Sequence, residues 1–281
     1  MHEWSLLIFT LCMQAAIGGT VMLLIFYKKL SKLDPEQQFH VMKLPLVVIA
    51  GLSLIGLAAS FTHLGSPENA LNTIRHLGSS WMSREILVTG MFIAVACGAA
   101  GLAFIQKKVN VWLLAAGAVI GLFDIYCMGA IYYNTLVSGW NSINTYTSFY
   151  GTAFVLGPIL IVSLLVPFLK AKNEELAQAF VKNAFYIALG GIAIQLIGVA
   201  IFGITAPEVN QIAGVNVRDA LEGYQTTVAI RWMIEIIGIF FIGYLSIAMN
   251  KKIPIYFAYG ALAVLIFAEG MSRYVFYVMG A

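Results

Sequence analysis

The segment between His63 and Glu85 gathers the residues of this chain that are best suited to proton chemistry. It contains two of the four histidines, two arginines and two glutamates, and strongly apolar runs border it on both sides. His63, with a reference pKa of about 6.5, can accept and release a proton near neutral pH, and the Glu85 carboxylate can take up a proton in turn. Two interpretations stay open: a proton-transferring site, or an ordinary polar connector that carries its charges at a membrane surface.

Five further ionisable residues lie inside long apolar runs, where such groups are costly and usually face a bundle interior or a wet cavity. Arg231 and Glu235 are four residues apart, as are Glu269 and Arg273, so a helix would place each pair on one face. Each pair can either neutralise itself inside the bundle or contribute to a site. Asp124 has no such partner, so we expect it to meet an arginine of another helix or to stay protonated.

Eight apolar runs must position these residues. The chain of 281 residues is 60% hydrophobic and 10% charged, with a mean hydropathy of +0.88, whereas about a quarter of the residues of a soluble domain are charged. Several runs reach the length of about 20 residues that crosses a bilayer, and the alternating segments of a membrane barrel are absent from the sequence. We predict an all-α polytopic membrane protein, an eight-transmembrane-helix bundle that forms one integral domain over residues 1–281, with spans near 4–27, 44–62, 86–106, 109–133, 146–169, 183–206, 229–250 and 253–279.

The lysines give this bundle an orientation. Eleven of the sixteen Lys and Arg residues lie in the odd-numbered connectors, for example Lys28 and Lys29 after the first span, whereas the even-numbered connectors hold Arg75, Arg84 and Arg218. By the positive-inside rule, the odd-numbered connectors are cytoplasmic and both termini lie on the non-cytoplasmic side. All the ionisable residues within the spans then fall in the outer half of the membrane.

Two local patterns add detail. Ser66-Pro67 is typical of a helix N-cap followed by proline at the first helical position, so we expect a short interfacial helix in the connector after His63. The segment Leu54–Ala58 of the second span resembles Leu196–Ala200 of the sixth. This likeness indicates a possible 4+4 pseudo-repeat, although chance similarity between common membrane residues is the alternative.

Several function classes are disfavoured by what the sequence lacks. The histidines do not provide paired axial ligands inside the bundle, and the three cysteines have no Cys-x-x-Cys spacing, so we expect neither haem nor an iron–sulfur cluster in this chain. No basic patch supports binding to nucleic acid. Imidazole, carboxylate, arginine and aromatic side chains at the outer leaflet suit a quinol, whose electrons would have to leave through a partner. A proton-coupled transporter is the alternative, and it would need a pathway through the inner half and broken helices.

The same residues also resemble a known family. The opening His2–Thr10, the segment His63-Leu64-Gly65-Ser66-Pro67, Ser83–Ile86, Arg231 and the ending Glu269–Tyr277 are similar over essentially the whole chain to the DmsC family. Its members are membrane anchor subunits of anaerobic dimethyl sulfoxide reductases. The resemblance implies a multi-pass protein of the bacterial inner (cytoplasmic) membrane that binds menaquinol. It also implies transfer of electrons to a four-cluster ferredoxin-like iron–sulfur subunit and, through it, to a molybdopterin catalytic subunit.

The resemblance also implies roles for individual residues. His63 and Glu85 match the quinol-site histidine and its acidic neighbour. The wider candidate quinol-binding set is Gly65, Ser66, Asp124, Tyr133, Arg231, Glu269 and Arg273. The chain lacks the arginine that some relatives carry just before the Tyr133-Asn134 pair. Anchors that serve polysulfide, tetrathionate or other acceptors remain alternatives, because the terminal acceptor belongs to the catalytic partner.

Overall fold

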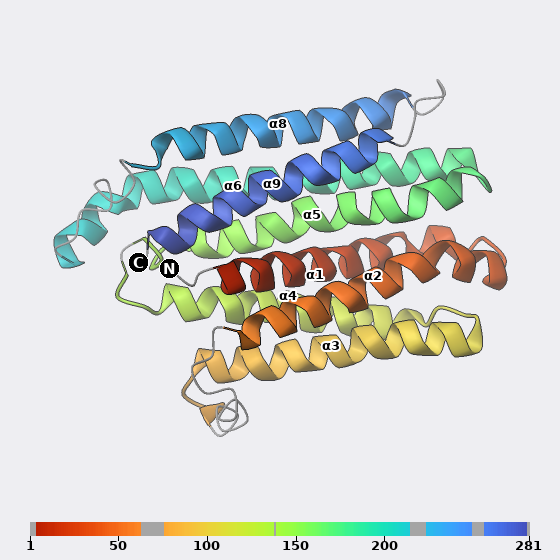
Figure 1. The fold of residues 1–281 in the computed structure, drawn as a ribbon, viewed down its shortest axis with the longest axis horizontal. Helices are drawn as coiled ribbons and strands as arrows, with labels where there is room; N and C mark the ends of the chain where they lie inside the picture. Colours follow the sequence, from red (N-terminus) through yellow and green to blue (C-terminus); the bar gives the residue numbers. More distant parts are fainter. Residues whose placement is uncertain (1–3, 63–75, 138, 214–222, 249–255, 280–281) are drawn as a thin grey trace.

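Eight long helices make up the described part of the protein, with no strand among them (Figure 1). The computed structural model describes residues 4–62, 76–137, 139–213, 223–248 and 256–279. The all-α prediction is therefore confirmed. The helices are α1 (Trp4–Leu30), α2 (Pro35–Phe61), α3 (Trp81–Gln106), α4 (Val111–Tyr133), α5 (Ile143–Lys170), α6 (Glu174–Ala213), α8 (Gln225–Ala248) and α9 (Tyr256–Val278).

Each of these helices is long and apolar enough to cross a membrane, and each predicted span overlaps one of them. Some helices continue well beyond their apolar run. Helix α2 begins at Pro35, nine residues before the predicted span, because proline fits the first helical position and Phe39 and Met42 are buried against the bundle. Helix α6 likewise begins at Glu174, where two acidic residues occupy the first turn.

The helices form two groups that meet along α1 and α5. Figure 1 shows α1 to α4 on one side of the bundle and α5, α6, α8 and α9 on the other, and α1 and α5 pack against each other between them. At their crossing, a Cβ atom added to Gly18 would overlap the carbonyl of Ala153, and one added to Gly157 would overlap the backbone of Gly18. Only glycine permits this backbone contact, which is a common way for membrane helices to approach closely.

The Gly117 and Gly121 pair of α4 serves close packing of a different kind. A Cβ atom added to Gly121 would lie 2.8 Å from Ile17 and 3.1 Å from Phe92, and one added to Gly117 would lie 3.3 Å from Thr20. These glycines therefore admit the side chains of α1 and α3 rather than another helix backbone.

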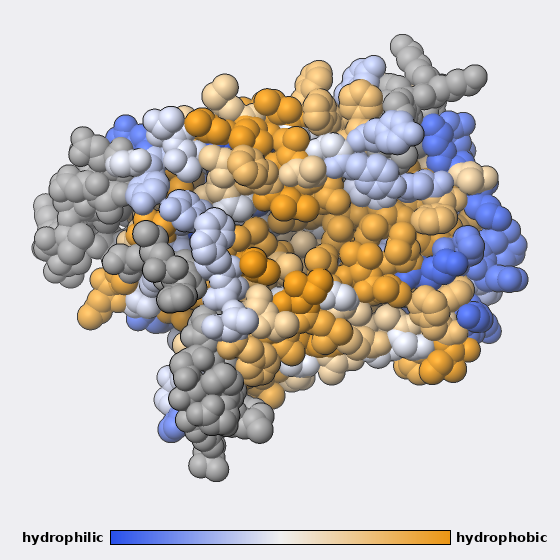
Figure 2. Space-filling model, in the orientation of Figure 1, coloured by the Kyte–Doolittle hydropathy of each residue, from blue (hydrophilic) through white to orange (hydrophobic). Residues whose placement is uncertain are grey.

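The two ends of the bundle differ in character. The start of α1 and the end of α9 lie at one end, and the turns after α1, α3 and α5, which carry lysines, lie at the other (Figure 1). Figure 2 shows a hydrophobic band around the middle of this face and hydrophilic residues gathered at the lysine-bearing end. Which of these ends faces the outer side of the membrane stays a prediction from the positive-inside rule. The predicted interfacial helix after Ser66 lies outside the described residues.

Candidate functional site

A cavity of about 300 Å³ lies between α1, α2, α3 and α4, in the half of the bundle nearer the termini. We call it the N-terminal cavity. Its wall is largely apolar, and Glu85 of α3, predicted as a site residue, is part of it. The residues that line it are Leu6, Phe9, Leu57, Ser60, Phe61, Met82, Glu85, Ile86, Thr89, Ile131 and Tyr132.

Thr89 connects this cavity to Asp124. It lies one helical turn after Glu85 on α3, and its hydroxyl donates a hydrogen bond of 2.8 Å to Asp124 Oδ1. Asp124 is fully buried, and its Oδ2 atom has no hydrogen-bond partner among the described residues. The partner of Asp124 is therefore a threonine rather than the arginine that the sequence offered as one possibility. Thr89 thus holds the Asp124 carboxyl group beside the cavity whose wall contains Glu85.

Arg84 anchors the connector that leads into α3. Its Nε atom donates to the carbonyl of Leu77 at 2.8 Å, and Nη2 donates to the carbonyl of Gly78 at 2.7 Å. The guanidinium group also lies 4.2 Å from the ring centroid of Trp81, within the range of a cation–π contact. These contacts fix the first turn of α3, from which Glu85 projects into the cavity wall.

The aromatic part of the wall comes from Tyr132. Its hydroxyl lies 3.4 Å from that of Tyr277, which in turn lies 3.4 Å from Thr10 Oγ1. The predicted Tyr133 instead packs against Tyr146, with ring centroids 5.3 Å apart. Helical spacing could have selected the correct tyrosine, because positions seven and eight residues after Asp124 share its face.

Arg231 and Glu269 meet in a second group of polar residues, buried between α5, α6, α8 and α9. Arg231 Nη2 lies 3.0 Å from Glu235 Oε2, so the predicted pairing along α8 is confirmed. The same nitrogen donates to Gln195 Oε1 and lies 3.9 Å from Glu269 Oε2. Gln195 Nε2 donates to Glu269 Oε1 at 2.7 Å. Together with Gln14, Thr152 and Arg273, these residues form a group that we call the buried charge network.

Arg273 joins the network through other helices rather than through a direct ion pair with Glu269. Thr152 Oγ1 donates to Glu269 Oε2 at 2.8 Å and accepts from Arg273 Nη2 at 3.2 Å. The same nitrogen donates to Gln14 Oε1 at 2.9 Å, and the guanidinium group lies 3.9 Å from the ring centroid of Phe149. The described residues therefore show no direct ion pair between Glu269 and Arg273, and each of the two bonds instead to residues of neighbouring helices.

Sequence reasoning missed the neutral members of this network, Gln14, Thr152 and Gln195. The two glutamines were detectable, because a glutamine inside an apolar span is expected to hydrogen-bond across helices. Thr152 gave no signal, since threonines are frequent in these spans and most bond to their own helix, as Thr20 does with the carbonyl of Ala16 at 2.9 Å.

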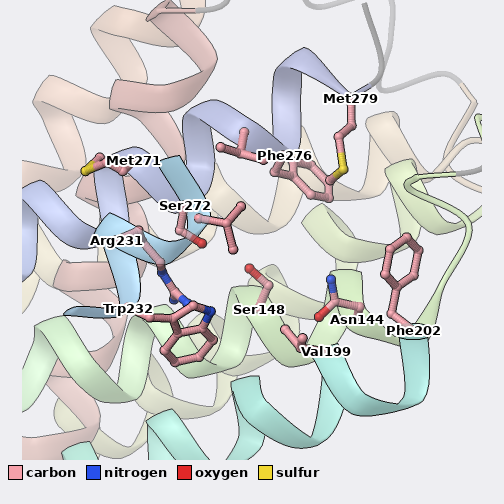
Figure 3. A pocket seen from close by; sticks show the side chains of 12 residues that line it. Asn144, Ser148, Val199, Phe202, Arg231, Trp232, Met271, Ser272, Phe276 and Met279 are labelled. Atoms are coloured by element: carbon pink, nitrogen blue, oxygen red, sulfur yellow. The ribbon is translucent and has the colours of Figure 1, made fainter. Parts of the chain in front are cut away.

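A smaller cavity, of about 140 Å³, borders the network (Figure 3). We call it the C-terminal cavity. Arg231 and Trp232 of α8, Asn144 and Ser148 of α5 and Ser272 of α9 contribute its polar groups. The other lining residues are Val199, Phe202, Val228, Met271, Val275, Phe276 and Met279.

The candidate residues thus divide between two places instead of surrounding one. Glu85 lines the N-terminal cavity and Asp124 bonds to Thr89 of its wall, whereas Arg231, Glu269 and Arg273 belong to the buried charge network. His63, Gly65 and Ser66 lie outside the described residues. Ser60 and Phe61, at the end of α2, line the N-terminal cavity, and His63 follows Phe61 by two positions in the sequence.

Comparison with known proteins agrees with these features. The family model described as DMSO reductase anchor subunit (DmsC) matches residues 1–279. The C chain of the anaerobic dimethyl sulfoxide reductase of Haemophilus influenzae is 32% identical over 202 residues, which cover 70% of each protein. The Escherichia coli protein of the same description is 35% identical over 172 residues, or 58% of each protein. The YnfH chain of an anaerobic dimethyl sulfoxide reductase of that organism is 31% identical over 169 residues, also 58% of each protein.

Proposed function

The chain belongs to the DmsC family of dimethyl sulfoxide reductase anchor subunits, and from this premise we propose that it oxidises menaquinol in the N-terminal cavity. As a member of this family it is a membrane anchor of a reductase complex, and its eight long apolar helices suit that role. The electrons would pass to a four-cluster iron–sulfur subunit and from there to a molybdopterin catalytic subunit. These two partners are part of the proposal.

The observation that carries the proposal is the position of Glu85 in the wall of a largely apolar cavity. A quinol headgroup is a flat apolar ring with hydroxyl groups, and such ligands bind in apolar cavities that hold a few well-placed polar groups. The Glu85 carboxylate can accept a hydrogen bond from one hydroxyl. Phe61 and Met82 line the cavity and are 43% and 49% exposed, so an isoprenoid tail has a route to the surrounding lipid.

The proton path follows from the groups beside this cavity. Oxidation of menaquinol to menaquinone releases two electrons and two protons. Glu85 accepts a proton at its carboxylate, and the second acceptor in this proposal is His63, which follows Phe61 by two positions in the sequence. Thr89, one helical turn after Glu85 on α3, donates to Asp124 Oδ1 at 2.8 Å, so a second carboxyl group is held beside the wall of this cavity. The electrons leave through the partner subunit.

A variant that fills the cavity tests the proposal. Ser60→Leu adds bulk to the wall of the N-terminal cavity, and Gly51→Leu adds bulk elsewhere on α2, where an added Cβ atom has no neighbour within 4 Å. In the assembled complex, Ser60→Leu should abolish reductase activity driven by menaquinol and preserve activity driven by a water-soluble reduced dye. Gly51→Leu should preserve both. Normal menaquinol turnover in a Ser60→Leu complex would show that the cavity is not the site.

A further inference from the structure

The two cavities hold equivalent places in the two halves of the bundle. Leu57 and Ser60 of α2 line the N-terminal cavity, and Val199 and Phe202 of α6 line the C-terminal one. Each residue of α2 is separated from its counterpart by 142 positions. The resembling segments that begin at Leu54 and Leu196 are separated by the same 142 positions. The sequence likeness and the positions of the cavity-lining residues therefore give the same alignment of α2 with α6.

The next helix of each half shows a similar correspondence, with an offset that is larger by four residues. Met82 and Glu85 of α3 line the first cavity, and Val228 and Arg231 of α8 line the second. The two pairs are 146 positions apart. The C-terminal cavity is thus the counterpart of the N-terminal one, with a guanidinium group in the place of the Glu85 carboxylate.

This exchange reverses the hydrogen-bonding character of the cavity. A carboxylate only accepts hydrogen bonds when ionised, whereas a guanidinium group only donates them. Figure 3 shows Arg231 beside Trp232, with Ser148 and Ser272 on the facing helices. The C-terminal cavity therefore favours a molecule that presents an accepting oxygen, in contrast to the hydroxyl groups of a quinol.

The charge of Arg231 is already balanced. Glu235 Oε2 lies 3.0 Å from Arg231 Nη2, and the network as a whole contains two arginines, Arg231 and Arg273, and two glutamates, Glu235 and Glu269. A neutral acceptor such as a carbonyl oxygen suits this environment better than an anion, because an added negative charge would face Glu235 and Glu269 inside the membrane.

We propose that the C-terminal cavity is a second binding site, which takes the carbonyl-bearing edge of an oxidised quinone. The choice of a quinone rests on the function proposed above, and the existence of the site rests on the equivalent cavity and the exchange of Glu85 for Arg231. The volume of about 140 Å³ admits one edge of the ring. Val199 is 45% exposed and leaves the ring and tail a lateral opening toward lipid.

Photolabelling of the assembled complex in lipid nanodiscs tests this site. The probe is an oxidised naphthoquinone that carries a diazirine on its ring, and labelled residues are located by mass spectrometry. We expect label on α8 and α9 as well as on α3. Ser272→Leu should lower labelling of α8 and α9 by about tenfold or more and leave labelling of α3 in place. Ser60→Leu should have the opposite pattern.

A control variant and a competing lipid distinguish the possible outcomes of this experiment. Gly203→Leu adds bulk to α6 where an added Cβ atom has no neighbour within 4 Å, and it should change neither labelling pattern. Label on α3 alone would overturn the second site while leaving the function of the N-terminal cavity intact. Loss of the α8 and α9 label on addition of phosphatidylglycerol, but not of unlabelled menaquinone, would identify a lipid and overturn the quinone assignment. No label on either half, together with no turnover of menaquinol, would overturn both proposals.

Discussion

Glu269 and Arg273 are joined through the hydroxyl group of Thr152, which lies 2.8 Å from Glu269 Oε2 and 3.2 Å from Arg273 Nη2. The two charged residues belong to α9, and the threonine belongs to α5. Since Gln14 of α1 and Gln195 of α6 bond to the same pair and Arg231 of α8 bonds to Gln195, the network ties five helices together.

Removal of this hydroxyl group should destabilise the protein. Thr152→Val keeps the shape of the side chain but leaves Glu269 and Arg273 each short of a partner, and an unsatisfied buried group costs about 1–3 kcal/mol. The unfolding temperature in nanodiscs should fall. Thr205→Val is the control, because the Thr205 hydroxyl bonds only to the carbonyl of Ile201 on its own helix. Equal unfolding temperatures for the two variants would mean that the Thr152 bridge contributes no stability.

Glu85→Gln should slow menaquinol oxidation by about a hundredfold or more, the usual contribution of a positioned proton acceptor. A carboxylate accepts a proton only when it is ionised, so the unmodified complex should lose activity at low pH. The amide group of the variant cannot ionise, and the acid limb of the pH profile should disappear. Activity driven by the reduced dye does not depend on menaquinol, so it shows whether the catalytic partner is intact. Glu174→Gln, a substitution of a carboxylate that pairs with Lys170 at the opposite end, should leave both activities and the pH profile unchanged.

His63→Arg should abolish menaquinol-dependent activity while assembly and dye-dependent activity persist. Arginine stays charged throughout the accessible pH range, so it cannot take a proton from a quinol hydroxyl. His76→Arg is a matched control in the same connector, where His76 is exposed and its carbonyl closes a local turn. A His63→Arg complex that still turns over menaquinol at the normal rate would remove this residue from the site.

Gly18→Ala should disrupt the packing of α1 on α5. The added methyl group would overlap the carbonyl of Ala153, which is backbone and cannot rotate away, and overpacking of a tight core costs about 1–3 kcal/mol. We expect less assembled complex in the membrane and a lower unfolding temperature. Gly90→Ala, in α3, adds a methyl group with no neighbour within 4 Å. If both variants assemble and unfold alike, α1 and α5 can move apart without cost.

The helices can be predicted from the sequence because the membrane environment favours helical structure in a long apolar segment. An apolar run of sufficient length must satisfy its backbone hydrogen bonds within itself, and in a bundle it does so as a helix. The first turns of α2 were missed because residues 35–43 are too polar to count as part of a span. They are helical because Phe39 and Met42 bury their side chains against the end of the bundle, a contact that depends on tertiary structure.

The candidate site was predictable where spacing along one helix decides the contact. Arg231 and Glu235 meet because they are four residues apart. The partners of Glu269 and Asp124 come from other helices, and no spacing within one helix can identify them. For the same reason, the sequence alone did not show that the polar residues separate into two groups, one in each half of the bundle.

The contact between Gly18 and Gly157 limits how the protein can work. Transporters that alternate between two open states rock one half of the molecule against the other. Here the axis of such a movement would run along α1 and α5, where backbone already touches backbone and the Arg273–Gln14 bond spans the same boundary. These contacts oppose such a movement, so we expect the two halves to move together as one unit.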